Sequence, residues 1–512
     1  MKSRSLFALV LAAAMVLMCI SGCGSQDPAD GKDELLVAIS AEPVTLDPSD
    51  QNDSASSLAI RQVYDPLLIQ DAEMNIQPGL AESWEFTDDT TLVLNLRQGV
   101  KFHNGETMTS ADVLYSLSRA LENPKVSSFI DCIDIENSSA IDEYTVELKT
   151  FYPFVPLLSN LALPSICIVS QKAVEEAGGD IGNTPCGTGP FKLTNWVSGD
   201  RLEFERNDEY WGSKPAFSKM TFRVIPENAN RAIELETGGV DIALSLAPND
   251  GTRLQDNPDV KVLVYASLST TGIQMNTSVE PFNDVRVRQA LNYACDYQAI
   301  GETVYEGYGE RQSAPMSTQV WGANTELPPY DYNPEKAREL LAEAGYEDGL
   351  PQKIYLVTND NRQRIDIFEI MQNQLAEVGI ESEIAVRDMA ALASFVPGKY
   401  EMFMAGWGTT TGDPDYGLYQ TFNSESGTAN SSRIQFYDQD VIDLLEAGRA
   451  ETDEAKRLEI YTEVQELIWD ACPWVWLWQT DTIDGTASYV EGYVPHPSGY
   501  FQDFTGVTFA QE

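Results

Sequence analysis

The sequence has 512 residues, of which 43% are hydrophobic and 10% aromatic, and a formal net charge of −46. A chain of this length and composition can bury the cores of two or three domains. The large negative charge repels nucleic acid and anionic lipid headgroups, so neither is expected as a partner.

The first 33 residues resemble an export signal followed by a tether. Lys2 and Arg4 precede an apolar run, Leu6–Ile20, that is too short to span a bilayer comfortably. Small residues then precede Cys23, as in the bacterial lipobox. This resemblance implies that residues 1–22 are a signal peptide, that Cys23 is diacylated, and that 23–33 form a flexible tether. The alternative is an ordinary signal peptide with an incidental cysteine.

Strand and helix patterns alternate after the tether. Leu92, Leu94 and Leu96 recur at every second position, which predicts a half-buried strand. Thr109 or Ser110 can cap the helix that follows. Further strands are expected at 144–150 and 201–206, and a helix followed by a short strand at 230–244.

Two helices in the second half of the chain carry clear terminal signals. Asp284 is placed to cap a helix that runs to Cys295. Asn333 and Pro334 are typical of a helix start, and Gly345 marks its end. Since no repeat and no Gly/Pro-rich linker divides the chain after residue 34, we expect an α/β or α+β architecture with interwoven lobes.

The cysteines and tryptophans leave alternatives open. Five cysteines follow Cys23, so at most two disulfides can form and one thiol stays free; their pairing cannot be read from the sequence. They are Cys132, Cys167, Cys186, Cys295 and Cys472, of which Cys295 is expected to be a buried free thiol.

Trp474, Trp476 and Trp478 alternate on one side of a predicted strand, where they form part of the core or, less commonly, a ligand platform.

The sequence offers no catalytic constellation. The two histidines, His103 and His496, lie in turns without a nucleophile-elbow pattern. The glycine-rich Gly187–Phe191 stretch lacks the Lys-Ser/Thr of a phosphate loop and indicates a tight turn before a strand. We therefore expect no enzyme activity, no cofactor and no metal site.

Seven segments in order resemble the extracellular solute-binding proteins of family 5, the peptide- and nickel-type receptors of ABC importers. The signature region is Ile76–Leu117, and the resemblance covers nearly the whole chain after the signal peptide. The other matching segments are Ala41–Pro48, Gly187–Phe191, Arg206–Pro215, Pro281–Ala294, Asn333–Tyr346 and Gly406–Tyr416.

The resemblance implies a fold and a function. The fold is α/β, two-lobed and periplasmic-binding-protein-like (type II), with a hinge. Lobe I comprises 34–70, 187–280 and 481–512, an inserted subdomain covers 71–186, and lobe II covers 281–480. The implied function is to trap a peptide or other small solute between the lobes, as a monomer, and to pass it to a permease and its ATPase subunits. The lipid anchor would hold the protein at the outer face of the cytoplasmic membrane.

The resemblance also implies candidate ligand contacts. In the family, the loop after the tryptophan of the Gly-Trp motif faces the ligand, which points to Trp407, Thr409, Thr410 and Asp413. Peptide-binding members commonly carry an aspartate three residues after that tryptophan, where this chain has Thr410. Asp413 is a substitute for that aspartate or, alternatively, a cap of its own turn.

A second departure concerns the arginine that dipeptide binders use on a strand of lobe II. This chain has Thr358 and Asn359 there, with Arg362 and Arg364 just after them. Both departures argue against strict dipeptide binding. They leave longer peptides, sugars and metal chelates as alternative ligands, and a surface hydrolase or a signalling or adhesion receptor as alternative functions.

Overall fold

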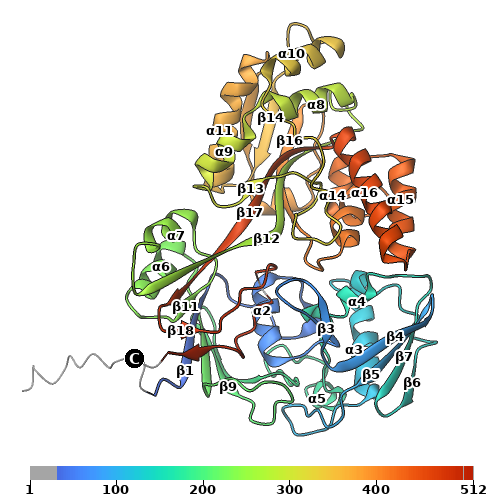
Figure 1. Ribbon diagram of the computed structural model, residues 1–512, viewed down its shortest axis with the longest axis vertical. Coiled ribbons are helices and arrows are strands. Elements are labelled where there is room, and N and C mark those ends of the chain that lie inside the picture. The colour runs from blue at the N-terminus through green and yellow to red at the C-terminus, as the bar shows by residue number, and fades with distance from the viewer. Residues whose placement is uncertain (1–30, 500, 511–512) are drawn as a thin grey trace, which may run out of the picture.

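One mixed sheet runs through both lobes of the molecule (Figure 1). The computed structural model describes residues 31–499 and 501–510; Cys23 and the predicted signal peptide lie outside them. In the described chain the sheet has eleven strands, ten of which follow the order β15-β14-β16-β12-β17-β11-β1-β10-β9-β8, while β13 (Glu310–Arg311) pairs with β17. The mixed α/β fold predicted from the sequence is confirmed.

Lobe I is built around β1, which pairs in parallel with β10 and β11. Leu35 and Val37 of β1 are fully buried, and Phe222 of β10 packs in the same core. The strands of this lobe are β1 (Glu34–Ile39), β8 (Phe191–Val197), β9 (Arg201–Arg206), β10 (Lys219–Val224) and β11 (Ile242–Ala243), and its helices are α2 (Ser54–Val63), α6 (Asn228–Glu236) and α7 (Pro248–Leu254).

A separate antiparallel sheet forms the inserted subdomain, beside lobe I in Figure 1. Its strands are β4 (Ala81–Asp88), β5 (Thr91–Leu96), β7 (Thr145–Lys149) and β6 (Ser139–Asp142), with α3 (Ser110–Glu122) packed against them. Leu92, Leu94 and Leu96 are buried, as their alternation predicts. The Asp112 carboxylate accepts a hydrogen bond from the Thr109 backbone N–H at 2.9 Å, which closes a capping box at the start of α3.

Short elements complete this half of the molecule. They are the strand pair β2 (Leu68–Gln70) and β3 (Ile76–Pro78), the helices α4 (Leu157–Asn160) and α5 (Gln171–Glu176), and the 3-10 turns η1 (Pro48–Asp50), η2 (Ser127–Phe129) and η3 (Pro164–Ile166). The tail adds β18 (Val490–Glu491) and β19 (Thr508–Phe509).

Lobe II surrounds the other half of the long sheet with helices. Its strands are β14 (Ile354–Thr358), β15 (Ser382–Val386) and β16 (Glu401–Gly408). Its helices are α8 (Val285–Ala294), α9 (Tyr297–Val304), α10 (Pro334–Glu343), α11 (Arg362–Glu377), α12 (Met389–Ala393), α13 (Gln420–Phe422), α14 (Ala429–Ile434), α15 (Gln439–Ala450) and α16 (Glu454–Ala471), with a π-helical turn η4 (Asp415–Tyr419). Asp284 and Asn333 cap α8 and α10 through their side chains, as predicted.

Two long neighbouring strands, β12 (Val260–Met275) and β17 (Trp474–Ala487), connect the lobes (Figure 1). Val260–Ala266 pair with Asp481–Ala487 on the lobe I side, and the register then shifts before pairing resumes at Thr270. Ile273 and Met275 already pack in the lobe II core.

The three tryptophans of β17 are core residues, but they do not share one face. Trp474 and Trp476 pack together with Trp469, whereas Trp478 packs with Val475 and Leu477 in a different cluster. A β-bulge between Trp476 and Trp478 causes this, because Leu477 is an extra residue opposite Thr271 and Gly272. The core interpretation is confirmed, and the single-sided stripe is wrong.

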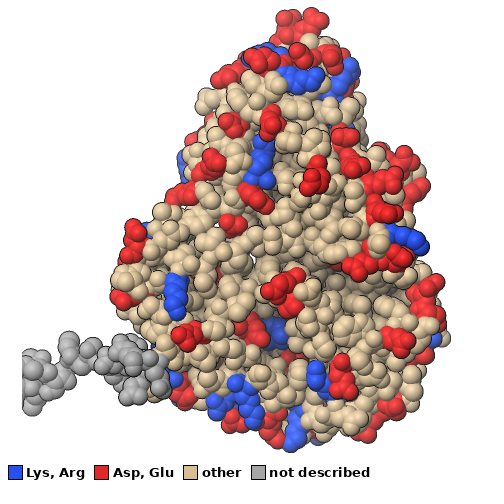
Figure 2. Space-filling view, in the orientation of Figure 1, with Lys and Arg blue, Asp and Glu red and all other residues tan. Residues whose placement is uncertain are grey.

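Three further features of the described chain are its free cysteines, its acidic surface and the character of its helices. Its five cysteines are all free, and Cys295 is buried as expected. Acidic side chains are spread over both lobes on the face shown in Figure 2. Among the described helices, none has the length and apolar character needed to cross a membrane.

Candidate functional site

A cavity of about 300 Å³ lies between the lobes and takes residues from both. Its size is at the lower end of the range of about 300–1,000 Å³ that is usual for small-molecule sites. One wall comes from lobe I and the inserted subdomain and includes Gln51, Asp53, Lys125, Phe129, Phe154 and Asn160. The other comes from lobe II and includes Trp407, Thr410, Asp415, Tyr416, Gln420 and Arg449, while Phe501 of the tail also contributes.

Three aromatic rings cross the boundary between the lobes. Trp407, near the end of β16, stacks on Tyr416 with ring centroids 5.3 Å apart and an interplanar angle of 16°. Tyr416 in turn stacks on Phe129 of the inserted subdomain at 5.7 Å and 25°. The Trp407 Nε1–H also donates to the Tyr416 backbone oxygen at 3.3 Å. These rings give the cavity a flat apolar side that is suited to aliphatic or planar parts of a solute.

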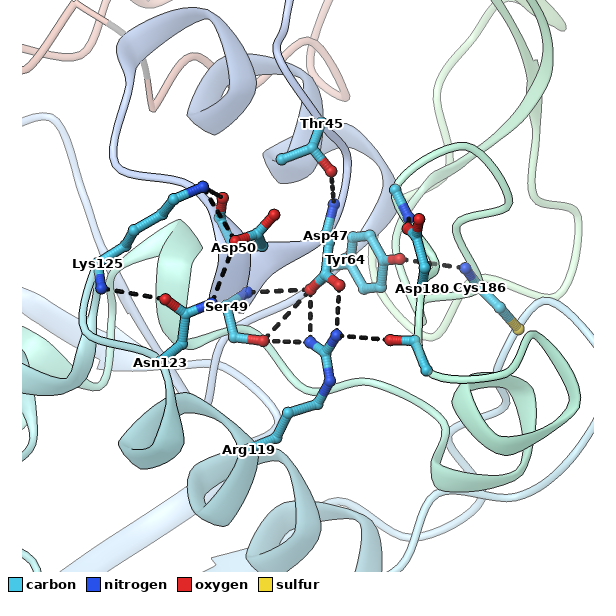
Figure 3. A network of polar contacts seen from close by, with 12 residues as sticks. Thr45, Asp47, Ser49, Asp50, Tyr64, Arg119, Asn123, Lys125, Asp180 and Cys186 are labelled. Atoms are coloured by element: carbon cyan, nitrogen blue, oxygen red, sulfur yellow. Dashed lines mark hydrogen bonds and ion pairs between the residues drawn. The ribbon is translucent and has the colours of Figure 1, made fainter.

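The inserted subdomain is tied to lobe I by a polar network (Figure 3). Arg119 of α3 grips the Asp47 carboxylate with both terminal nitrogens and donates to the Gly179 oxygen at 3.0 Å. Lys125 Nζ lies 2.8 Å from the Asp50 backbone oxygen and 2.9 Å from its carboxylate. These contacts fix the position of Lys125, which lines the cavity. They also connect the inserted subdomain to lobe I, so the two supply one continuous wall of the cavity.

The lobe II wall contains an ion pair whose geometry is incomplete. Arg449 Nε lies 2.9 Å from Asp415 Oδ1, yet the two atoms are not aligned for a hydrogen bond. Both atoms are buried and have no hydrogen-bond partner among the described residues. The Arg449 guanidinium lies over the ring of Tyr419, 3.8 Å from its centroid, and 4.9 Å from that of Phe154. Both residues line the cavity.

Burial raises the pKa of the Asp415 carboxyl to about 7. Asp413 and Glu446 add to this increase, while Arg449 and Arg457 oppose it. With Asp415 ionised, the charged side chains that line the cavity are Asp53, Asp415, Lys125 and Arg449, which balance to zero. The cavity is thus much less negative than the protein as a whole.

Asp413, which the sequence offered as a ligand contact, lies in a buried ion pair instead. Its two carboxylate oxygens accept hydrogen bonds from Arg457 of α16 at 2.7 and 2.8 Å. Its Oδ1 also accepts from the Asp415 backbone N–H at 2.9 Å, which is the turn-capping contact weighed as the alternative. Asp413 does not line the cavity; its contacts hold the loop that presents Asp415 and Tyr416.

The other sequence candidates divide into two groups. Trp407 and Thr410 line the cavity, and buried Thr409 supports their loop through a 3.0 Å hydrogen bond from its backbone N–H to Leu268. The cavity residues do not include Thr358, at the end of β14, or Asn359, which follows it. They do not include Arg362, at the start of α11, either. The Arg362 side chain is 70% exposed and pairs with Asp366 and Glu369 on its own helix.

Sequence reasoning missed Asp415, Tyr416 and Arg449, as well as the whole lobe I wall. Asp415 and Tyr416 belong to the segment that carries the Gly-Trp motif, so their position was a usable signal. Nothing in the sequence around Arg449 distinguishes it from other helix-terminal arginines. Arg449 lines the cavity because α15 brings it beside Asp415, and local sequence patterns do not reveal that contact.

Comparisons with known proteins agree with this architecture. The sequence model of the bacterial extracellular solute-binding proteins, family 5 (middle part), matches residues 75–429. The glutathione-binding protein GsiB of Escherichia coli K12 is 30% identical over 510 residues, covering 97% of this chain and 98% of GsiB.

Two solved structures extend the likeness to the fold. HbpA2 of Haemophilus parasuis superposes with a TM-score of 0.83 at 27% identity, covering 93% of this chain and all of HbpA2. The periplasmic binding protein DppA of Helicobacter pylori, in complex with the peptide STSA, gives a TM-score of 0.79 at 27% identity and covers 94% of this chain and 98% of DppA. The chain belongs to the bacterial extracellular solute-binding proteins of family 5, and it is a non-catalytic substrate-binding protein of an ABC transporter.

Proposed function

We propose that this protein is a lipid-anchored receptor that captures a small peptide or peptide-like solute and delivers it to a membrane permease. The observation that carries the proposal is the cavity between the lobes, which has aromatic walls and a balanced set of two carboxylates and two cations. A peptide has the same make-up, because it combines opposite charges at its ends with apolar side chains. GsiB and DppA, whose names or titles refer to glutathione and a tetrapeptide, support a peptide-like ligand.

Trp407 and Thr410 are the proposed contacts of the Gly-Trp loop, and Thr409 and Asp413 hold that loop in place. The proposal excludes the dipeptide arrangement of the family, since Thr410 replaces the usual aspartate and Arg362 points to solvent on α11. The size of the cavity favours a solute of a few residues over a long peptide.

Mass spectrometry of the purified protein under native conditions tests this function. We expect a bound peptide or peptide-like molecule that leaves after unfolding and rebinds after refolding. Calorimetry of the stripped protein with that molecule should give one site per chain, and Trp407→Ala should weaken binding because a stacking surface is lost. Recovery of only a sugar or a metal chelate would contradict the proposal.

A further inference from the structure

The hairpin formed by β2 and β3 contacts lobe II at the loop that follows the Gly-Trp motif. Gln70, at the end of β2, donates a hydrogen bond from Nε2 to the Thr411 backbone oxygen. Met74, in the turn of the hairpin, packs against a core cluster of lobe II. Thr411 and Gly412 directly follow Thr410, which lines the cavity. The hairpin therefore holds the loop that the solute is proposed to touch.

Gly412 allows this close approach because it has no side chain. Its φ is +67°, in the left-handed region that favours glycine. A Cβ atom at this position would lie 2.5 Å from Met74 Cε and 3.2 Å from Gln70 Nε2. The hairpin and the loop are thus in direct contact along the Gly412 backbone.

The turn that carries Met74 is held in one shape by hydrogen bonds. The Asp71 carboxylate accepts from the backbone N–H groups of Glu73 and Asn75 at 3.1 and 2.8 Å. It also accepts from the Gln77 side chain at 2.8 Å. Within this turn Met74 has a φ of +65°, which is uncommon for a bulky residue and unfavourable for its backbone. The contact of the Met74 side chain with lobe II offsets that cost.

We propose that this hairpin is a latch of the closed protein, in which Gln70 and Met74 are positioning residues. Leu68 of β2 is buried in the core of the inserted subdomain, whereas the loop after Thr410 belongs to lobe II. Separation of the lobes would break the contacts between them. The latch and the solute therefore favour the same closed arrangement, and each strengthens the other. A bound solute leaves only after the latch has opened, so the hairpin sets the dissociation rate.

The latch differs from the other contacts between the two halves. Phe129 and Arg449 line the cavity themselves, so a change in either alters the solute site as well as closure. Gln70 and Met74 do not line the cavity. Substitutions in the hairpin therefore separate closure from direct contact with the solute. The inference goes beyond the proposed function, because docking of the hairpin requires no particular solute.

The decisive experiment crosslinks the latch. Met74 Cβ lies 3.4 Å from the Cβ position at Gly412. This separation is close to the range of about 3.5–4.5 Å that is usual between the Cβ atoms of a disulfide. Met74→Cys/Gly412→Cys should thus form a disulfide under mild oxidation and show two fewer thiols after unfolding than its reduced form. Each single cysteine variant is a control and should lose no such pair.

The probe for solute release is an equimolar mixture of X-Ala-Ala tripeptides, read by native mass spectrometry. Oxidation after loading should trap the tripeptides through a buffer exchange that strips the same protein after reduction. Trapping distinguishes a latch that controls release from a contact that merely supports the fold.

Met74→Ala tests the latch without a crosslink. Loss of the partly buried side chain should enlarge the radius of gyration of the stripped protein and speed tripeptide dissociation roughly 3- to 30-fold. Met74→Leu keeps the apolar bulk and should restore both values. Glu73→Ala removes an exposed side chain from the same turn and should change neither.

The outcomes separate the latch from the proposed function. A folded double-cysteine variant that does not crosslink overturns the latch. So does a Met74→Ala protein with the radius and the dissociation rate of the wild type, which also decides if the double variant does not fold. Retention of no tripeptide by the wild type counts against the proposed function alone, because the disulfide and the radius of gyration are measured without solute.

Discussion

Asp413 and Arg457 form a bidentate ion pair that is buried in lobe II, with N–O distances of 2.7 and 2.8 Å. Arg457 also donates from Nε to the Gly448 oxygen at 2.8 Å, so its guanidinium joins the loop before η4 to α15 and α16. The pair holds the loop that carries Asp415 without itself lining the cavity.

Asp413→Ala should therefore destabilise the protein strongly. The change leaves the Arg457 charge buried without its partner, a loss that typically costs about 3–5 kcal/mol in the free energy of unfolding. Urea unfolding followed by tryptophan fluorescence measures it. Arg362→Ala, which removes an exposed ion pair, is the comparison and should leave the midpoint unchanged. Equal midpoints for all three proteins would contradict the assigned role.

Phe129→Ala should favour the open arrangement of the lobes. The Phe129 ring stacks on Tyr416 across the boundary between the inserted subdomain and lobe II. An aromatic pair contributes about 0.5–1.5 kcal/mol beyond its buried area, so affinity for the co-purified ligand should fall roughly 2- to 10-fold. Small-angle scattering should show a larger radius of gyration without ligand. Phe151→Ala removes an exposed ring from the same subdomain and should change neither quantity.

His496 should make the protein less stable in mild acid. Burial and, to a smaller extent, the nearby charge of Arg61 lower the pKa of His496 to about 4, so the folded state holds the imidazole neutral. The unfolded state takes up a proton near pH 6.5, which means that the stabilisation is complete above pH 6.5 and disappears as the pH falls to 4. The loss is up to about 3 kcal/mol. Denaturant melts of His496→Gln should show a flatter pH dependence in this window; an unchanged slope would contradict the assignment.

Reducing agent should not affect stability. All five described cysteines are free, and burial raises the pKa of Cys295 to about 12, which keeps its thiol unreactive. Cys186 is only partly buried, and it should react first with a thiol reagent. Protein without residues 1–23 should thus titrate one fast thiol when native and five after unfolding. A lower melting temperature in dithiothreitol would instead reveal a disulfide.

Cys23→Ser should release the protein from the membrane, since the proposed acyl chains on that residue supply the anchor. Fractionation of cells grown with labelled palmitate measures both the location and the lipid. Cys19→Ser alters a neighbouring cysteine inside the proposed signal peptide and should leave anchoring intact. A Cys23→Ser protein that keeps its label and its membrane location would contradict the lipoprotein proposal.

Local signals in the sequence predicted local structure well. The caps at Asp284 and Asn333 and the alternation of Leu92, Leu94 and Leu96 depend on residues a few positions apart, and the structure confirms them. These patterns work because capping and strand burial are decided within one turn or one strand.

The site depends on contacts that are distant in sequence. Arg457 captures Asp413 from 44 residues away, and this decides that Asp415 is the carboxylate left at the cavity. The bulge in β17 likewise arises from its pairing with β12, so the alternation of three tryptophans could not reveal it. The family resemblance pointed to a loop that lines the cavity, but only the packing of α15 and α16 distinguishes its two aspartates.

The passage of β12 and β17 from one lobe to the other has a consequence for engineering. Both ends of the described chain belong to lobe I. Ala266 pairs directly with Asp481 where the two strands leave that lobe. Along the chain, lobe II is one continuous segment inserted between two antiparallel paired strands, β12 and β17. A two-residue Asn-Gly turn joining Ala266 to Asp481 would close these two strands into a hairpin. The module that supplies Asp415 and Arg449 can therefore be excised, or exchanged between homologues, with only two cuts in the chain.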